Sequence, residues 1–268
     1  MAAILQPPDE VLGDLGRLID ALSEYRAVAV LTGGFVPLMY RSIPGYLSPP
    51  TPPLLTSDFD WTVPVRLELL GGRLLADRLT DSGFVAIPSA GTEPPVLRFQ
   101  SERFGSGRLG PVYAEFLAPL VGSEVGRAGS SKDVILVQDG LTAQALRYLD
   151  LLFVEPVSFD AGAVPGLGLG RSTSILLPNP GSYVCQKLLA WPSREQDKRA
   201  KDFAYVYEVA VLTQKHWPDV AAVVGRLKVR FPSAWFERTR DLVLRKFGSQ
   251  YSDGPVAVVR QYRDIPVG

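Results

Sequence analysis

The sequence is poor in two residue types on which many enzyme sites depend. Cys185 is the only cysteine among 268 residues, so the chain can form neither an internal disulfide nor a thiolate metal site, and a reducing compartment fits best. His216 is the only histidine, which argues against Ser-His-Asp, Cys-His and multi-histidine zinc chemistry. We therefore expect His216 to be structural.

Net charge and long apolar runs are missing as well. The chain carries 28 basic and 28 acidic residues, so its overall field favours neither nucleic acid nor an anionic membrane. No stretch of about eighteen apolar residues occurs, and the first residues lack the basic segment of a signal peptide. These absences predict a cytoplasmic protein without a membrane segment.

What charge there is lies unevenly along the chain. Residues 1–60 hold seven acidic and three basic residues, whereas residues 187–248 hold thirteen basic and seven acidic ones. The first part is suited to cations and the second to anions. The basic C-terminal part could also contact RNA, although it lacks regularly spaced aromatic residues that would stack on bases.

Hydrophobic periodicity predicts a mixed sheet with flanking helices, an α+β fold, followed by a mostly helical C-terminal region. We place a boundary between residues 1–175 and 176–268. A turn is expected at 105–110 and surface loops at 121–133 and 161–172, the last read as a hairpin or linker, not a phosphate loop. Asn179 should cap a helix that Pro192 ends. The predicted helices are 9–25, 35–41, 71–82, 141–152 and several after 179, and the predicted strands are 27–32, the strand around 58–60, 83–88, 96–104, 111–120 and 134–138.

The stretch "LTSDFDWTVP", residues 55–64, places two acids one residue apart in a predicted strand. Asp58 and Asp60 then share one face, within about 7 Å of each other, while Phe59 and Trp61 take the opposite face. Crowded carboxylates need compensation, and Mg²⁺, which keeps water and phosphate oxygens as its other ligands, supplies it. Glu115 in the strand "PVYAEFLAPL" is the candidate third acid, which predicts a two-metal site.

The stretch "LTGGF" precedes this strand and places Gly33 and Gly34 between a buried strand and a short helix. A glycine turn lets backbone N–H groups approach a phosphate closely. A Gly-Gly turn, then an Asp-x-Asp strand about two dozen residues later, points to one shared site at the end of a sheet.

In these motifs the chain resembles the nucleotidyltransferases of the polymerase beta superfamily, whose signature is a Gly-Gly or Gly-Ser turn, an acidic pair and a later third acid. It resembles most closely the bacterial AbiEii-like toxin nucleotidyltransferases and related uncharacterised proteins, over residues 27 to 212. The resemblance implies a nucleotidyltransferase fold, NTP as substrate and Mg²⁺ or Mn²⁺ as cofactor. It implies Asp58, Asp60 and Glu115 as catalytic and metal-binding residues, and Thr32, Gly33, Gly34, Arg41, Thr56, Lys187, Arg194, Lys201 and Asp202 as nucleotide-binding residues.

The implied reaction transfers a nucleoside monophosphate to an acceptor hydroxyl on an RNA end, a protein or a small molecule, with release of pyrophosphate. The third acid is usually aspartate, and Glu115 is one methylene longer, so a nucleotide- or partner-binding module without turnover is the alternative. A sugar-nucleotide glycosyltransferase also uses an Asp-x-Asp motif, but only 57 residues precede Asp58 here. Asp202 could orient either Lys198 on its own helix or Lys187 across the fold.

Overall fold

A nine-stranded sheet organises the first two thirds of the chain. The computed structural model describes residues 9–49, 51–54, 56, 58–89, 95–102, 111–120, 134–170 and 172–263; the turn predicted at 105–110 and the loop predicted at 121–133 lie outside them. The strands are β1 (Val30–Leu31), β2 (Asp58–Thr62), β3 (Phe84–Pro88), β4 (Leu97–Ser101), β5 (Tyr113–Pro119), β6 (Val134–Gln138), β7 (Leu141–Leu146), β8 (Val157–Asp160) and β9 (Ser174–Leu177).

The sheet is mixed, as predicted, and runs in the order β3-β4-β5-β2-β1-β9-β8. Strand β2 pairs parallel with β5 and antiparallel with β1, and β1 pairs parallel with β9. Strand β5 also pairs antiparallel with β4 and parallel with β7, which in turn pairs with β6. The central strand β2 thus has the Gly-Gly turn on one side and Glu115 on the other.

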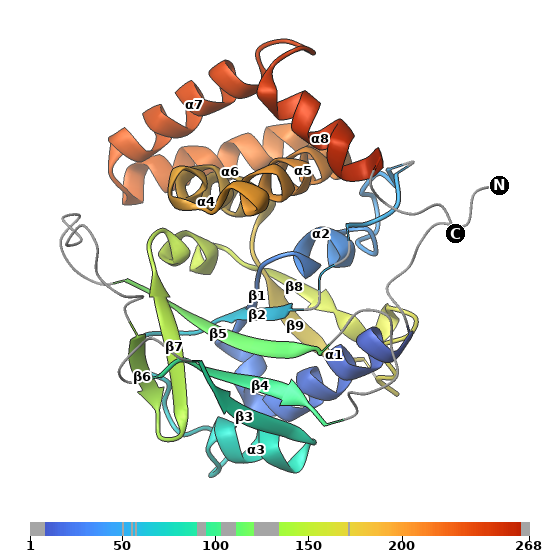
Figure 1. Ribbon diagram of the computed structural model, residues 1–268, viewed down its shortest axis with the longest axis vertical. Coiled ribbons are helices and arrows are strands. Elements are labelled where there is room, and N and C mark those ends of the chain that lie inside the picture. Colours follow the sequence, from blue (N-terminus) through green and yellow to red (C-terminus); the bar gives the residue numbers. More distant parts are fainter. Residues whose placement is uncertain are drawn as a thin grey trace.

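Most helices of the second half lie together on one side of the sheet, at the top of Figure 1, whereas α1 and α3 lie lower in the view. No helix within the described ranges is both long and apolar enough to cross a membrane. The α-helices are α1 (Asp9–Leu22), α2 (Phe35–Tyr40), α3 (Leu75–Asp81), α4 (Pro180–Ala190), α5 (Gln196–Leu212), α6 (Trp217–Arg230), α7 (Ser233–Phe247) and α8 (Asp253–Arg263), and the short 3₁₀ helices are η1 (Ser23–Ala27), η2 (Leu149–Phe153), η3 (Ala161–Ala163), η4 (Trp191–Ser193) and η5 (Gln214–His216).

One hydrophobic core joins the sheet to helices of both halves. Phe59 and Trp61 of β2 are fully buried in it, together with Leu15 of α1, Tyr183 of α4 and Phe203 of α5. The predicted boundary at residue 175 falls inside β9, which pairs with both β1 and β8. The helices that follow the sheet therefore pack onto it through a shared core.

The prediction of a helix over residues 141–152 was wrong. Residues Leu141–Leu146 form β7, which pairs with β5 and β6, and Leu149–Phe153 form η2. The leucines and alanines suggested a helix, but burial between two strands outweighs this weak local preference. Asp139 and Gly140 form the two-residue turn between β6 and β7, with Gly140 at φ +72°, which is the hairpin signal that the sequence carried.

Two local predictions were confirmed at the start of the helical region. The side chain of Asn179 accepts a hydrogen bond from the Gly181 N–H at 3.0 Å, with Pro180 in the first turn of α4. Segment 161–172 connects the antiparallel strands β8 and β9, so it is a hairpin connection and not a phosphate loop between a strand and a helix.

Candidate functional site

The three predicted acids project from two neighbouring strands toward one cavity. In the parallel pair of β2 and β5, Asp58 lies opposite Tyr113 and Asp60 opposite Glu115, so the alternation predicted for both strands is confirmed. Asp58, Asp60 and Glu115 all line a cavity of about 180 Å³. Phe59 and Trp61 point to the opposite face and are fully buried. The core thus anchors β2 through one face while the other face presents carboxylates.

The carboxyl of Asp60 is perturbed by its surroundings. Burial raises the pKa of the Asp60 carboxyl to about 7, and the negative charges of Glu115 and Asp58 contribute in the same direction. The positive charges of Lys187 and Arg194 oppose this shift but do not cancel it. The cavity therefore holds negative charge that a cation would stabilise.

Gly33 brings the turn after β1 against this carboxylate. It has φ +68°, and a Cβ atom at this position would lie 1.9 Å from Asp60 Oδ2. Both the left-handed backbone and the lack of space therefore require glycine here. Gly34 is constrained by packing alone, because a Cβ atom there would lie 2.4 Å from the Tyr205 hydroxyl and 2.9 Å from Thr56.

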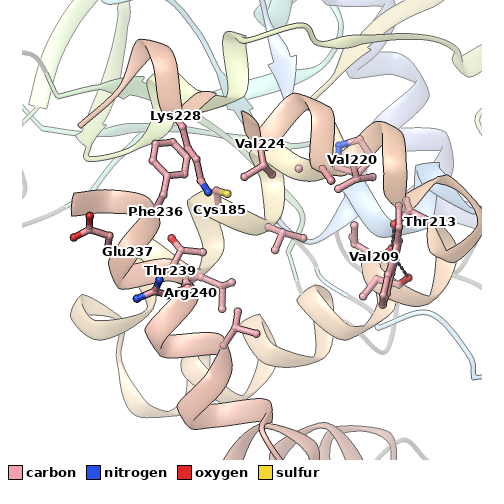
Figure 2. Close-up of a pocket in the computed structure, with 18 of the residues that line it drawn as sticks. Cys185, Val209, Thr213, Val220, Val224, Lys228, Phe236, Glu237, Thr239 and Arg240 are labelled. Carbon is pink, nitrogen blue, oxygen red and sulfur yellow. Dashed lines mark hydrogen bonds between the residues drawn. The ribbon is translucent and has the colours of Figure 1, made fainter. Parts of the chain in front are cut away.

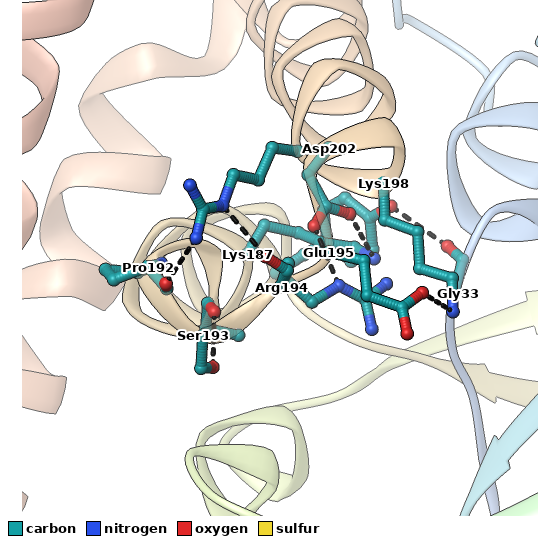
Figure 3. A network of polar contacts seen from close by, with 11 residues as sticks. Gly33, Lys187, Pro192, Ser193, Arg194, Glu195, Lys198 and Asp202 are labelled. Atoms are coloured by element: carbon teal, nitrogen blue, oxygen red, sulfur yellow. Dashed lines mark hydrogen bonds and ion pairs between the residues drawn. The ribbon is translucent and has the colours of Figure 1, made fainter.

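The cationic side of the cavity is built on α4 and the start of α5 (Figure 3). The carboxylate of Asp202, only 2% exposed, accepts from Lys187 Nζ at 3.1 Å and from Arg194 Nε at 3.0 Å. Lys187 is itself buried, with its ammonium over the rings of Tyr183 and Tyr205 at 5.6 and 5.4 Å. Asp202 therefore contacts Lys187, one of its two predicted partners.

Lys198 is held elsewhere on the same helix. Its ammonium pairs with Glu195 at 2.9 Å, and both side chains are largely exposed. Lys198 nevertheless lines the cavity, so it adds positive charge at the mouth.

Glu115 is held by a residue that sequence analysis missed. Arg98 of β4 lies directly opposite Glu115, with its Nε 2.9 Å from Glu115 Oε1, and it lines the same cavity. Alternation along β4 and the turn predicted between β4 and β5 were the sequence signals from which Arg98 could have been found.

In the part of the chain that the structure describes, no three Asp, Glu, His or Cys side chains are grouped closely enough to hold a metal ion as they stand.

Two polar residues at the cavity were also missed, namely Gln144 of β7 and Gln186 of α4. Gln144 could not be placed because its segment was predicted as a helix. Gln186 precedes Lys187 on α4 and carried no signal of its own.

The predicted nucleotide-binding residues divide into two groups. Thr32, Gly33, Lys187, Arg194 and Asp202 line the cavity together with the acids. The cavity lining does not include the other four, which are Gly34, Arg41, Thr56 and Lys201.

The side chain of Arg41 makes contacts that stabilise the fold. Its guanidinium pairs with buried Glu208 at 2.6 Å and donates to the Thr51 carbonyl at 2.9 Å, which ties the proline-rich loop to α5.

Lys201 is partly buried on α5, directly before Asp202. His216 hydrogen-bonds the Gly45 carbonyl at 3.1 Å and packs against Tyr46, away from the acids.

Comparison with known protein families identifies the family of the chain. A sequence-family model described as nucleotidyltransferase matches residues 12–224. The chain belongs to this nucleotidyltransferase family. The match covers most of α1, the whole sheet and α4 and α5, and so includes every residue of the cavity.

Other comparisons add little to the family assignment. No curated protein matches the chain. A crystal structure of an antigenic nucleotidyltransferase-like protein from Paracoccidioides brasiliensis is similar at 14% identity and a TM-score of 0.43, covering 87% of this nucleotidyltransferase and 93% of that chain. The structural similarity and the sequence identity are too low to support a functional conclusion.

Proposed function

We propose that this nucleotidyltransferase transfers a nucleoside monophosphate from an NTP to an acceptor hydroxyl and releases pyrophosphate. The observation that carries the proposal is the meeting of Asp58, Asp60 and Glu115 with Lys187 and Arg194 in one cavity beside the Gly33 turn. Acids on one wall and cations on the other match the needs of phosphoryl chemistry, in which positioning and charge stabilisation do most of the work.

The acids fit a divalent cation in kind, because all three donors are carboxylate oxygens, which Mg²⁺ and Mn²⁺ prefer. We propose that Asp58 and Asp60 hold the ion and that Glu115 joins them when it leaves Arg98. The ion would activate the attacking oxygen and stabilise the leaving pyrophosphate. Burial and, after it, the neighbouring carboxylates raise the pKa of Asp60, and a bound cation would favour its charged form.

The chain's own residues have separate tasks in this proposal. Lys187 and Arg194, both held by Asp202, bind the triphosphate as a point charge and as a fork of donors. The acceptor oxygen attacks the α-phosphorus, the bond from that phosphorus to the pyrophosphate oxygen breaks, and Glu115 receives the hydroxyl proton. Before the ion binds, Arg98 holds the Glu115 carboxylate at the cavity, with its Nε 2.9 Å from Glu115 Oε1, so that Glu115 is in place for this step.

Magnesium-dependent release of pyrophosphate, measured with each of the four NTPs, tests the proposal. RNA, protein and small-molecule hydroxyls are offered in turn, and the resemblance to AbiEii-like toxins makes RNA and protein the first acceptors to try. We expect turnover in the wild type and none in the Asp58→Asn/Asp60→Asn variant. Asp20→Asn, which changes an exposed acid on α1, is the matched control and should retain activity.

The ion pair between Arg98 and Glu115 favours a second candidate, a module that binds nucleotide or a partner without turnover. In this candidate Arg98 permanently neutralises the third acid, which agrees with the lack of a grouped metal site among the described residues. Saturable NTP binding by calorimetry, without pyrophosphate release for any acceptor, would favour this module over the enzyme.

A further inference from the structure

Helix α4 separates the acidic cavity from a second and larger one. Gln186 and Lys187 border the acidic cavity, whereas Val184, Cys185 and Leu188 line a cavity of about 680 Å³ among α4, α5, α6 and α7 (Figure 2). That volume lies within the range of about 300 to 1,000 Å³ typical of small-molecule sites.

The lining of this second cavity is mainly aliphatic and aromatic. Val209 of α5, Val220 and Val224 of α6 and Phe236 of α7 face the space. Apolar side chains also reach the rim in exposed positions, since Trp217 is 55% and Val243 37% exposed. An apolar cavity with exposed apolar side chains at its rim is typical of a binding site.

Charge is confined to one end of the cavity. Lys228, Glu237 and Arg240 lie at the end near Cys185, whereas Val209, Thr213 and Val220 lie at the other end (Figure 2). Along α6, Lys228 lies eleven positions after Trp217, which corresponds to a rise of about 16 Å, so the two ends are well separated. An occupant that matches this cavity has a long apolar body and one polar head.

The charged end favours an anionic head. Lys228 is exposed and makes no ion pair within the described ranges, while Arg240 pairs only with its exposed neighbour Asp241 at 3.1 Å. Helix α7 begins here at Ser233, after Pro232, without a side-chain cap. The Trp235 N–H donates to the Pro232 carbonyl at 3.0 Å, which leaves the N–H groups of Ser233 and Ala234 to favour an anion. Glu237 opposes an anion and Asp241 already pairs with Arg240, so the preference for an anionic head rests on Lys228, which makes no ion pair within the described ranges, together with the helix terminus.

We propose that this cavity binds a single-chain anionic amphiphile, of the chemical class of a long-chain carboxylate. The tail lies along α6 toward Trp217, and the carboxylate lies between Lys228 and the first turn of α7. The site is distinct from the acidic cavity, and its test does not depend on nucleotidyl transfer.

Cys185 provides a specific reporter, because it is the only cysteine, is 3% exposed and lines the cavity. Burial raises the pKa of its thiol to about 12, so modification by a small thiol reagent will be slow and easily timed. The experiment measures this rate and the heat of binding for the full chain with dodecanoate, dodecanol and dodecyltrimethylammonium, each below its micelle concentration.

We expect saturable binding of dodecanoate that slows Cys185 modification by about tenfold or more, because a bound tail covers the thiol. Dodecanol should bind about tenfold more weakly, since it lacks the charge that Lys228 recognises, and dodecyltrimethylammonium more weakly still. Lys228→Glu should weaken dodecanoate binding by about tenfold, whereas Arg230→Glu, the same charge change on α6 outside the cavity, should leave it unchanged.

Val224→Trp fills the cavity and should abolish dodecanoate binding, with circular dichroism showing that the variant is folded. Three results would overturn the proposal. These are the absence of saturable binding, equal binding of all three amphiphiles, and Cys185 protection that rises with protein concentration without ligand, which would assign the groove to a second copy of the chain.

Discussion

The two faces of α4 border cavities of opposite character. The cavity of about 180 Å³ is lined by ionisable side chains from the sheet, α4 and α5, and the one of about 680 Å³ by apolar side chains from helices alone. Volume alone would point to the larger one. Converging charges, a carboxyl pKa raised to about 7 and a glycine that only a close approach explains all belong to the smaller one. Chemistry is therefore located by charge placement and not by size.

Helical geometry explains how one helix can serve both cavities. Successive residues on an α-helix point about 100° apart, so Lys187 faces away from Cys185 and Leu188 despite their closeness in sequence. Substitutions on the two faces of α4 should therefore separate nucleotide chemistry from amphiphile binding.

The largest effect is expected for Asp60→Asn. Removing a carboxylate that lines the acidic cavity should lower magnesium-dependent pyrophosphate release by about 1,000-fold or more, because the ion loses a ligand. Turnover assays at saturating NTP check this. Asp20→Asn should be indistinguishable from wild type, and an active Asp60→Asn variant would contradict the assignment of the site.

Asp202→Asn should lower both stability and turnover. The change leaves Lys187 buried without its anionic partner, which we expect to cost about 3 kcal/mol of unfolding free energy. Urea denaturation measures it. Glu195→Gln removes an exposed ion pair with Lys198 on the same helix and should cost less than about 1 kcal/mol. Equal effects of the two variants would refute a special role for Asp202.

Arg98→Gln should tighten metal binding while slowing turnover. Without Arg98, Glu115 loses a cation that competes with the metal for its carboxylate, so we expect the Mn²⁺ dissociation constant to fall by about tenfold. Calorimetry without nucleotide measures it, with Arg66→Gln as the exposed control. Weaker Mn²⁺ binding would instead mean that Arg98 holds Glu115 in the ligating position.

The smallest effect concerns stability and pH in metal-free buffer. Because the pKa of Asp60 is about 7 in the folded state, against 3.8 as its ordinary value, the folded chain binds more protons than the unfolded chain between these pH values. Wild-type stability should fall as pH rises through this interval. Asp60→Asn should therefore be more stable than wild type at pH 8 and lose that advantage toward pH 4, as urea denaturation at several pH values will show. A constant difference across the range would show that Asp60 is not the group responsible.

Sequence patterns predicted the acidic wall of the site better than its surroundings. Alternation alone placed Asp58 and Asp60 on one face, and the β2–β5 register brought Glu115 beside them. Arg98 was missed although a predicted turn joined its strand to that of Glu115, because the register that places Arg98 opposite Glu115 cannot be read from either strand alone.

The fold was predicted least well where local preference and tertiary pairing disagree. Residues 141–152 contain helix-favouring alanine and leucine, yet β5 and β6 both supply pairing edges for Leu141–Leu146. The contacts of Arg41 and Lys201 could not be predicted either, because a charged residue in a sequence does not indicate which residue it will contact in the fold. For Arg41 that partner is Glu208, more than 160 residues away in sequence.

The hydroxyl of Tyr183 donates to the Gly33 carbonyl at 2.9 Å within the core, and so joins the helix that supplies the cations to the turn that faces the acids. A hinge motion between these two walls would break this buried bond, at a cost of about 1 to 3 kcal/mol. The distance between the walls is thus fixed before any substrate arrives. Selection among triphosphates should accordingly follow the dimensions of a rigid opening and not a closing movement.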